Sequence, residues 1–573
     1  MKLEKGLSIA LTLALVVLFG LAIWFRISSL KAAPQPFEDE AYFGVQTAHL
    51  LAGETVATKT PTGNPLNYLL VVLEAPLVAA FGPSFTVLRI TAVFAGLAAI
   101  LLMYVLMARV LDRTTALIAA ALLAALPIAI IHSRLAWEAS QFPLFSILSL
   151  YFAFRGRRLA LLLSYIFSLY LHPTFVFQAP ILLCILAVPL LRQTAGDPPA
   201  RLRALMTTMG VALLVVVPYG LLKKQSRGMK YVETFHSGLG PCDWGKFFKL
   251  FQNLLLGRCQ GVPTDTSHLL DWTFWSILVG ALVFGSYRLI RQRAWDRLAL
   301  VVGVVIGVTG FHLTLGPDVL HPAMSRYGMF LVAPVVLAFA CLVRSLLVPA
   351  SSRPLQVLRG GQVALLLAIG LALLFSFKIH FFDIFAIQQP GGERIWTLKD
   401  EMTWPQQGLT SLILRDLDRA GAVPTQGRRV VIVQGWDSPW CIRFLASRRR
   451  DIKVVHFDII GSKDKDGPVK DLARIAAEQR RVLLKQISEG GYGVGLKGQT
   501  LDQWVAASFP PERLRRWEVQ LGWSPPYVIY RLKRPAELAD SALPQVAGRI
   551  EGQPPSEGAT EHDPSPLIAE VER

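Results

Sequence analysis

Long apolar runs recur along about the first two thirds of the chain, and they restrict its fold more than any other feature. Most are roughly 17–25 residues long, the length an α-helix needs to cross the hydrocarbon core of a bilayer. Inside lipid each backbone polar group must find a partner within its own segment, so such runs are expected to be helices. The sequence therefore predicts a polytopic α-helical membrane protein with about 11 transmembrane helices. The predicted spans are Leu7–Phe25, Phe85–Met107, Thr115–Ile131, Phe142–Phe154, Leu159–Leu171, Phe175–Leu191, Leu205–Leu222, Leu270–Tyr287, Leu298–Leu315, Tyr327–Val343 and Gln362–Phe377.

Basic residues are concentrated in alternate loops, which determines the predicted orientation. Short loops rich in Lys and Arg stay on the cytoplasmic side of a membrane. Lys2 and Lys5 precede the first span, so the N-terminus and every second loop after it are expected in the cytoplasm. The net charge of +18 is then mostly an orientation signal, and it does not indicate a nucleic-acid partner. The arginines of these loops are Arg109, Arg113, Arg155, Arg157, Arg158, Arg192, Arg201, Arg203, Arg288, Arg291, Arg293, Arg297, Arg344, Arg353 and Arg359.

One apolar segment, Leu66–Phe81, is predicted to lie on the outer membrane face instead of crossing the bilayer. Counting it as a span would place the arginine-rich loops outside, and it also contains Asn67 and Glu74. The first span is expected to be an uncleaved anchor, although Lys31–Ala33 resembles the end of a signal peptide.

After the last span the composition becomes mixed, and residues 378–534 are predicted to form a soluble α/β domain. Arg429–Val433 and Tyr527–Leu532 have the pattern of strands. An odd number of spans after a cytoplasmic start places this C-terminal domain outside the cytoplasm. Residues 1–377 form the predicted transmembrane domain, and the Pro-, Gly- and acid-rich residues 535–573 form a predicted disordered tail. The other predicted elements are the helices Gln406–Ala420, Trp440–Ala446 and Val469–Ile487 and the strand Ile452–Phe457.

Two cysteines, Cys242 and Cys259, share one outward loop, in a compartment where disulfides form. They are expected to pair, and the alternatives are free thiols or a bond to Cys441. No cysteine or histidine cluster has the spacing of a zinc site. Gly493–Gly498 matches the letters of a dinucleotide-binding fingerprint, but no clear predicted strand precedes it and it lies in the outward domain, so we set this interpretation aside.

An acidic pair, Asp39 and Glu40, follows the first span closely on the outward side. A carboxylate this close to a bilayer costs free energy, so it is usually kept only where it has a function. We therefore treat Asp39 and Glu40 as candidate functional residues. Partial desolvation at a membrane interface raises a carboxyl pKa toward the range of a general base. Adjacent side chains diverge, so one is expected to act as a base while the other holds the loop. The alternative is that Asp39 only caps the following helix, Ala41–Leu51.

Other charged residues lie on the outward loops. Arg134 and Glu138 are spaced so that they either pair across one helical turn or supply a phosphate ligand and a second acid. Arg326 and Tyr327 begin a late span. A guanidinium there suits a lipid phosphate because it binds phosphate oxygens in a fork, and interfacial anchoring is the alternative. Lys59, in the first outward loop, is a further candidate cation.

Together these segments resemble the membrane-embedded GT-C glycosyltransferases, in particular the protein O-mannosyltransferase-like and lipid A aminoarabinose transferase-like enzymes. In that family an Asp-Glu pair opens the first outward loop, and a Pro-Leu-x-Tyr element starts a juxtamembrane helix. The second outward loop carries an arginine with an acid four residues on, and an Arg-Tyr pair opens a late span. The second-loop acid is commonly Asp in the family. The matching residues here are Asp39 and Glu40, Pro65–Tyr68, Arg89, Arg134 with Glu138, and Arg326 with Tyr327.

The resemblance implies an inverting transfer of a hexosyl or pentosyl sugar from a polyprenyl-phosphate donor to a protein, lipid or glycan acceptor. The reaction is expected on the outer face of the cytoplasmic (inner) membrane, with membrane lipids as further partners. No cofactor is certain, and a divalent metal stays open. The alternatives are a lipid-linked sugar transporter or flippase and a non-catalytic GT-C-like binding subunit. The implied catalytic residues are Asp39, Glu40 and Glu138, and the implied donor phosphate ligands are Lys59, Arg134, Arg326 and Tyr327.

Overall fold

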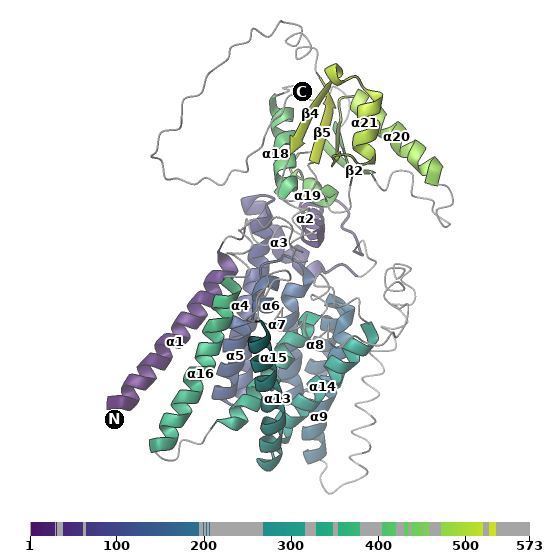
Figure 1. The fold of residues 1–573 in the computed structure, drawn as a ribbon. Helices are drawn as coiled ribbons and strands as arrows, with labels where there is room; N and C mark the ends of the chain where they lie inside the picture. Colours follow the sequence, from purple (N-terminus) through teal and green to yellow (C-terminus); the bar gives the residue numbers. More distant parts are fainter. Residues whose placement is uncertain are drawn as a thin grey trace, which may run out of the picture. The chain divides into compact units, whose positions relative to one another are not determined.

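A computed structural model places most of the chain in two compact units (Figure 1). The first unit comprises Met1–Pro34 and His49–Lys399, and the second comprises Gln35–Ala48 and Asp400–Arg573. The structure describes residues 2–28, 30, 38–60, 65–193, 199, 202, 206, 267–315, 328–347, 353–378, 404–419, 429–434, 438–449, 451–457, 472–519 and 527–533.

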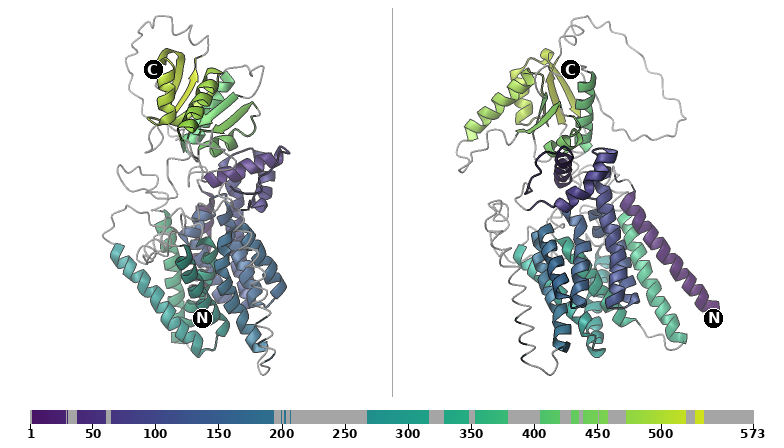
Figure 2. Two further views of the ribbon diagram at one scale, coloured as in Figure 1. Left: turned by 90° about the vertical axis from the view of Figure 1, so that its right-hand side faces the viewer. Right: turned by 180° about the vertical axis from the view of Figure 1, so that it is seen from behind.

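The described part of the first unit is built from α-helices (Figure 2). Several of them pack at close range: a Cβ atom added to Gly303 would lie 2.8 Å from the Cα of Ile181, so only glycine lets the two backbones come this near. The helices are α1 (Lys2–Ile27), α3 (Tyr68–Phe81), α4 (Phe85–Val110), α5 (Arg113–Ala125), α6 (Pro127–His132), α7 (Phe142–Phe154), α8 (Arg158–Leu171), α9 (Ala179–Gln193), α13 (Ser267–Arg291), α14 (Trp295–Leu315), α15 (Met329–Leu346) and α16 (Arg353–Phe377).

Two of the described helices, α4 and α15, are long and apolar enough to cross a membrane by length and composition alone. The other apolar helical stretches among the described residues are shorter. They are Thr12–Ile27, Tyr68–Phe81, Arg113–Ala125, Arg158–Leu171, Pro173–Pro189 and Ala364–Phe375. The predicted total of about 11 spans therefore stays a prediction, and the predicted span Leu205–Leu222 lies outside the described residues apart from isolated positions.

The predicted span Thr115–Ile131 is broken in the structure. Helix α5 ends at Ala125 and α6 begins at Pro127. Proline has no N–H to continue the helix, and it forces the preceding residue out of the helical region. Leu126 accordingly has φ −68° and ψ 119°, and Pro127 becomes the first residue of the next helix. A similar change occurs before α9, where the 3-10 helix η2 (Pro173–Gln178) takes the start of the predicted span.

The second unit contains a five-stranded sheet with the order β2-β1-β3-β5-β4. Strand β1 (Arg429–Val433) lies parallel to β2 (Ile452–His456) and to β3 (Tyr492–Leu496). Strand β5 (Tyr527–Leu532) runs antiparallel to β3 and to β4 (Leu514–Val519). The strand β1, helix α19 (Ser438–Leu445), strand β2, helix α20 (Leu472–Ser488) and strand β3 thus follow one another as two successive β-α-β connections, as parallel pairing requires.

Both faces of this sheet are covered, because side chains alternate along each strand. Val431 and Ile529 pack with α19 and with α18 (Trp404–Arg419) on one face. Ile432 and Val528 pack with α20 and with α21 (Thr500–Ser508) on the other face. A sheet buried on both sides explains the continuous apolar pattern that identified β1 and β5 in the sequence.

Candidate functional site

The acidic pair lies in the first turn of helix α2 (Glu38–Leu51). The positive end of a helix dipole favours carboxylates in this position. The helix starts before Asp39, so Asp39 is a residue of its first turn and not the cap of a helix that begins at Ala41. Glu40 is fully buried and Asp39 is half-buried. The two side chains therefore have different environments, as the sequence analysis expected of adjacent residues.

An aromatic contact joins α2 to the sheet of the same compact unit. The ring of Tyr42 meets the ring of Trp440 edge to face, with 4.8 Å between their centroids. Trp440 also meets the ring of His456 at 4.9 Å, and the guanidinium carbon of Arg443 lies 5.7 Å from the Trp440 ring centroid. Trp440 belongs to α19 and His456 ends β2, so the Trp440 ring lies between Tyr42 of α2 and the carboxyl end of β2.

In the first unit, the loop between α6 and η1 is held at the end of α1 by buried arginines. Arg134 is fully buried and donates hydrogen bonds to the backbone oxygens of Phe25 and Ser28. Arg89 of α4 donates to the oxygen of Leu30 at 2.7 Å. Because the last carbonyls of a helix have no partner within it, these guanidinium groups complete the end of α1.

A third arginine, Arg26, lies in the same region. Its guanidinium donates to Ala124 O at 2.8 Å and Ala22 O at 2.9 Å, which ties α1 to α5. Burial, and then the positive charges of Arg89 and Arg26, lower the pKa of Arg134 to about 9. The three charges thus lie close enough to interact. Arg26 was not predicted as a site residue, because a single arginine beside an apolar run belongs to no recognisable motif.

Arg134 and Glu138 do not lie on one helical turn. Helix α6 ends at His132, and Glu138 opens the separate 3-10 helix η1 (Glu138–Gln141). The i, i+4 spacing that predicted a helical pair therefore does not apply. The loop is packed tightly against α4, since a Cβ atom added to Gly96 would lie 2.5 Å from Ser133 Cβ.

Lys59 lies close in space to the residues that begin helix α3. It forms an antiparallel bridge with Pro65, and the backbone N–H of Leu66 donates to Thr58 O at 3.0 Å. The side-chain oxygen of Asn67 caps α3 at the Leu70 N–H, while its amide donates to Gln141 Oε1 at 2.9 Å. Gln141 shares η1 with Glu138, so Asn67 joins the start of α3 to the 3-10 helix that contains Glu138. Neither amide residue had been predicted to act at the site.

The predicted site residues thus fall into three groups. Asp39 and Glu40 belong to the second compact unit, while Lys59, Arg134 and Glu138 belong to the first. Arg326 and Tyr327, like Cys242 and Cys259, lie outside the described residues. Within the described ranges, no group of three or more His, Cys, Asp and Glu side chains is arranged to hold a metal ion.

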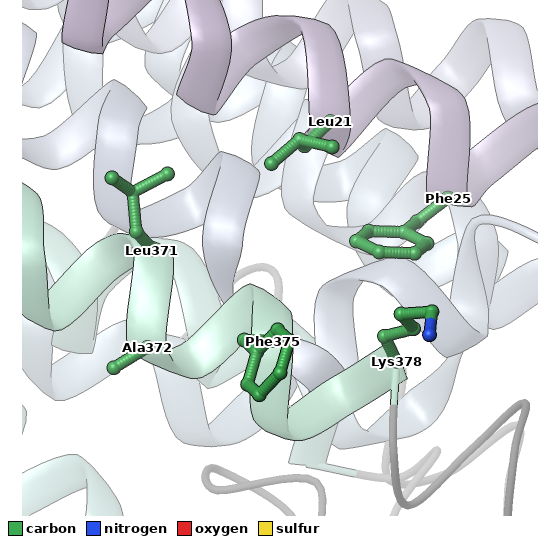
Figure 3. A pocket seen from close by; sticks show the side chains of 6 residues that line it. All are labelled: Leu21, Phe25, Leu371, Ala372, Phe375 and Lys378. Carbon is green, nitrogen blue, oxygen red and sulfur yellow. The ribbon is translucent and has the colours of Figure 1, made fainter.

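A cavity of about 440 Å³ opens between α1 and α16. Figure 3 shows Leu21 and Phe25 of α1 across from Leu371 and Phe375 of α16. Ala372 and Lys378 complete its lining. Among the described residues that line the cavity, all but Lys378 are apolar.

The chain as a whole is similar in fold to ArnT from Cupriavidus metallidurans. The structure of ArnT bound to undecaprenyl phosphate has a TM-score of 0.51 and 12% identity, over 90% of this chain and 97% of ArnT. The apo structure has a TM-score of 0.52 and 12% identity, over 91% of this chain and 98% of ArnT. ArnT is a lipid A aminoarabinose transferase of the GT-C superfamily. This chain has the GT-C fold.

The GT-C fold confirms, at the level of the fold, the resemblance drawn from the acidic pair and the loop motifs, and it supports an α-helical membrane fold. At this level of identity the likeness concerns the fold. The archaeal oligosaccharyltransferase AglB from Archaeoglobus fulgidus, in complex with an inhibitory peptide and a dolichol-phosphate, has a TM-score of 0.47 and 13% identity, over 91% of this chain and 74% of AglB. No family model and no curated protein matches the sequence.

Proposed function

We propose that this protein is an inverting glycosyltransferase. It moves a sugar from a polyprenyl-phosphate donor to an acceptor on the outer face of the cytoplasmic membrane. The observation that carries the proposal is an acidic pair in the first turn of α2, in a chain whose fold matches a GT-C enzyme bound to undecaprenyl phosphate over 90% of its length. About 11 spans and an extracytoplasmic α/β domain complete the proposed topology.

The proposed reaction is a single displacement at the anomeric carbon. The Asp39 carboxylate takes the proton of the acceptor nucleophile, which attacks from the face opposite the phosphate. The bond between the anomeric carbon and the phosphate oxygen breaks, and the bonding pair leaves with the lipid phosphate. The configuration at the anomeric carbon therefore inverts. The proton ends on Asp39 and returns to water.

The remaining roles follow from charge. Lys59 and Arg326, with Tyr327, stabilise the negative charge that grows on the leaving phosphate. Glu138 orients the acceptor or supports Asp39, and Glu40 holds the start of α2. Arg134 was assigned to the phosphate on sequence grounds. Because its guanidinium donates to Phe25 O and Ser28 O, we propose that it acts on the phosphate side indirectly, by holding the outward end of α1.

The test is a donor panel. Membranes containing the protein, and matched membranes without it, are supplied with radiolabelled polyprenyl-phosphate sugars. If the protein is a transferase, we expect labelled acceptor to form together with released polyprenyl phosphate. Movement of intact labelled donor across the membrane without release would indicate a transporter. Donor binding with neither release nor movement would indicate a non-catalytic binding subunit.

A further inference from the structure

The contact between Tyr42 and Trp440 joins α2 to the C-terminal α/β fold. Residues 35–48 and 400–573 form one compact unit, although more than three hundred residues separate them in sequence. Tyr42 is buried, and its ring lies edge to face with Trp440 at 4.8 Å and an interplanar angle of 87°. Such edge-to-face pairs stabilise a contact beyond the effect of the area they bury.

Trp440 lies in a packed part of the fold. Its neighbours in α19, Cys441 and Ile442, are buried, and Ile442 belongs to the core on that face of the sheet. On its other side the Trp440 ring meets His456 at 4.9 Å, where β2 ends beside Val433 of β1. A side chain supported by a helix and a strand end provides a fixed surface for α2.

Tyr42 and Asp39 lie three residues apart on α2, which places them on the same face of the helix, one turn apart. A ring contact at Tyr42 therefore limits the rotation of α2, and with it the direction of the Asp39 carboxylate. Displacing a catalytic group by about 1 Å costs on the order of 100-fold in rate. A small movement of α2 would therefore change the rate of transfer strongly.

We propose that Trp440 is a positioning residue for the acidic pair, and that the C-terminal α/β fold is a working part of the active centre because it orients α2 through the Tyr42 ring. This inference rests on the proposed function. It gives the C-terminal fold a role that the position of Trp440 in the sequence does not suggest. The low pKa of His456, about 4 because of burial and the charge of Arg443, keeps that ring neutral at physiological pH and preserves the apolar contact.

The first arm of the test compares steady-state transfer by Trp440→Ala and Trp504→Ala in the full-length protein. Trp504 is also half-buried, but it packs on Phe457 at 5.6 Å in the core of the opposite face. Trp440→Ala should lower kcat about 10- to 100-fold and leave the donor KM unchanged, and Trp440→Phe should recover most of the rate. Trp504→Ala should keep kcat. Equal losses in the two alanine variants would overturn the proposal, because they would indicate general loss of the fold.

The second arm asks whether Trp440 acts through Tyr42. In a double-mutant cycle, Tyr42→Ala with Trp440→Ala should cost little more than Trp440→Ala alone, both in kcat and in thermal unfolding of the full chain. Additive losses would overturn the inference. The unfolding cycle needs no transfer activity, so it tests the contact even if the wild-type protein transfers no sugar. Failure of the proposed function and failure of this inference therefore give different results.

Discussion

Arg134 was predicted from the sequence to bind the donor phosphate, but in the structure its guanidinium binds backbone carbonyl oxygens. Its guanidinium donates to two carbonyl oxygens at the end of α1, and no part of its side chain is exposed. The sequence motif predicted an arginine at this position, but a motif does not show which acceptor its guanidinium binds. The structure shows that Arg134 is buried beside the end of α1, where backbone carbonyls are its acceptors.

Replacing Arg134 by lysine tests this role. An ammonium group does not reproduce the planar fork of the guanidinium, so one buried carbonyl should lose its partner at a cost of about 1–3 kcal/mol. We expect a lower unfolding temperature in nanodiscs and an unchanged donor KM. Arg109→Lys, at an exposed position, serves as the control. A higher donor KM at unchanged stability would instead assign Arg134 to the phosphate.

His456 provides a prediction about pH. Burial, and then the charge of Arg443, lower its pKa from 6.5 to about 4. Between these values the unfolded chain binds a proton that the folded chain does not, so stability should fall as the pH drops from 6.5 to 4. The loss is on the order of 2 kcal/mol, because the partly exposed ring feels less than the full shift.

The measurement for His456 is thermal unfolding of the full chain from pH 7.5 to pH 4. Other groups titrate over the same range, so the informative quantity is the difference between the wild type and His456→Phe. The variant should lack the part of the decline that His456 causes. Curves of equal slope for the two proteins would contradict the assignment.

At the scale of elements, sequence patterns identified those strands and helices whose periodicity is strong. The predicted bounds of β1 and β5 agree with the structure, as do those of α7. Strand β3 was missed because Gly493 and Gly495 remove the side chains that mark a strand, and these glycines let Leu501 pack at 3.3–3.4 Å from their Cβ positions. Strand β4 was missed because Arg515, Arg516 and Glu518 mask its apolar face. Parallel pairing of β1 with β3 depends on contacts distant in sequence, which no local pattern contains.

One charged network connects three elements of the second unit. Asp416 of α18 is buried and accepts hydrogen bonds from Arg531 Nε of β5 at 2.6 Å and from Tyr492 OH of β3 at 2.7 Å. Burial, and then the contact with Asp416, raise the pKa of the Tyr492 hydroxyl, so that the phenol stays a donor. Charges buried in this way are stable only while both partners are present.

Asp416→Ala should therefore destabilise the second unit by about 3–5 kcal/mol, because it leaves the Arg531 guanidinium buried without its carboxylate. Asp418→Ala is the matched control: this side chain is 64% exposed and pairs with Arg449, and exposed pairs contribute at most about 1 kcal/mol. Chemical unfolding followed by tryptophan fluorescence measures both. Similar losses in the two variants would show that burial does not govern this network.

At the scale of the whole molecule, charge asymmetry and motif order in the sequence predicted a GT-C membrane protein, and the structure has the GT-C fold. The arrangement of the elements in space was harder to predict from the sequence. Nothing in the sequence near Asp39 indicates that α2 shares a compact unit with residues 400–573, because the partner ring of Tyr42 belongs to a residue nearly four hundred positions away. Local residues thus sufficed to predict candidate acids, and that prediction awaits its test, while the contact between Tyr42 and Trp440 could not be predicted from them.

The most direct test of the account is sugar transfer by Asp39→Asn compared with Glu54→Gln. Glu54 is a carboxylate just beyond α2, 57% exposed and 3.6 Å from His49. Asparagine keeps the shape of Asp39 and removes the base, so transfer should fall by at least about 100-fold, with donor binding and membrane insertion retained, while Glu54→Gln should transfer at the wild-type rate. Wild-type transfer by Asp39→Asn would contradict the proposed base and the mechanism built on it.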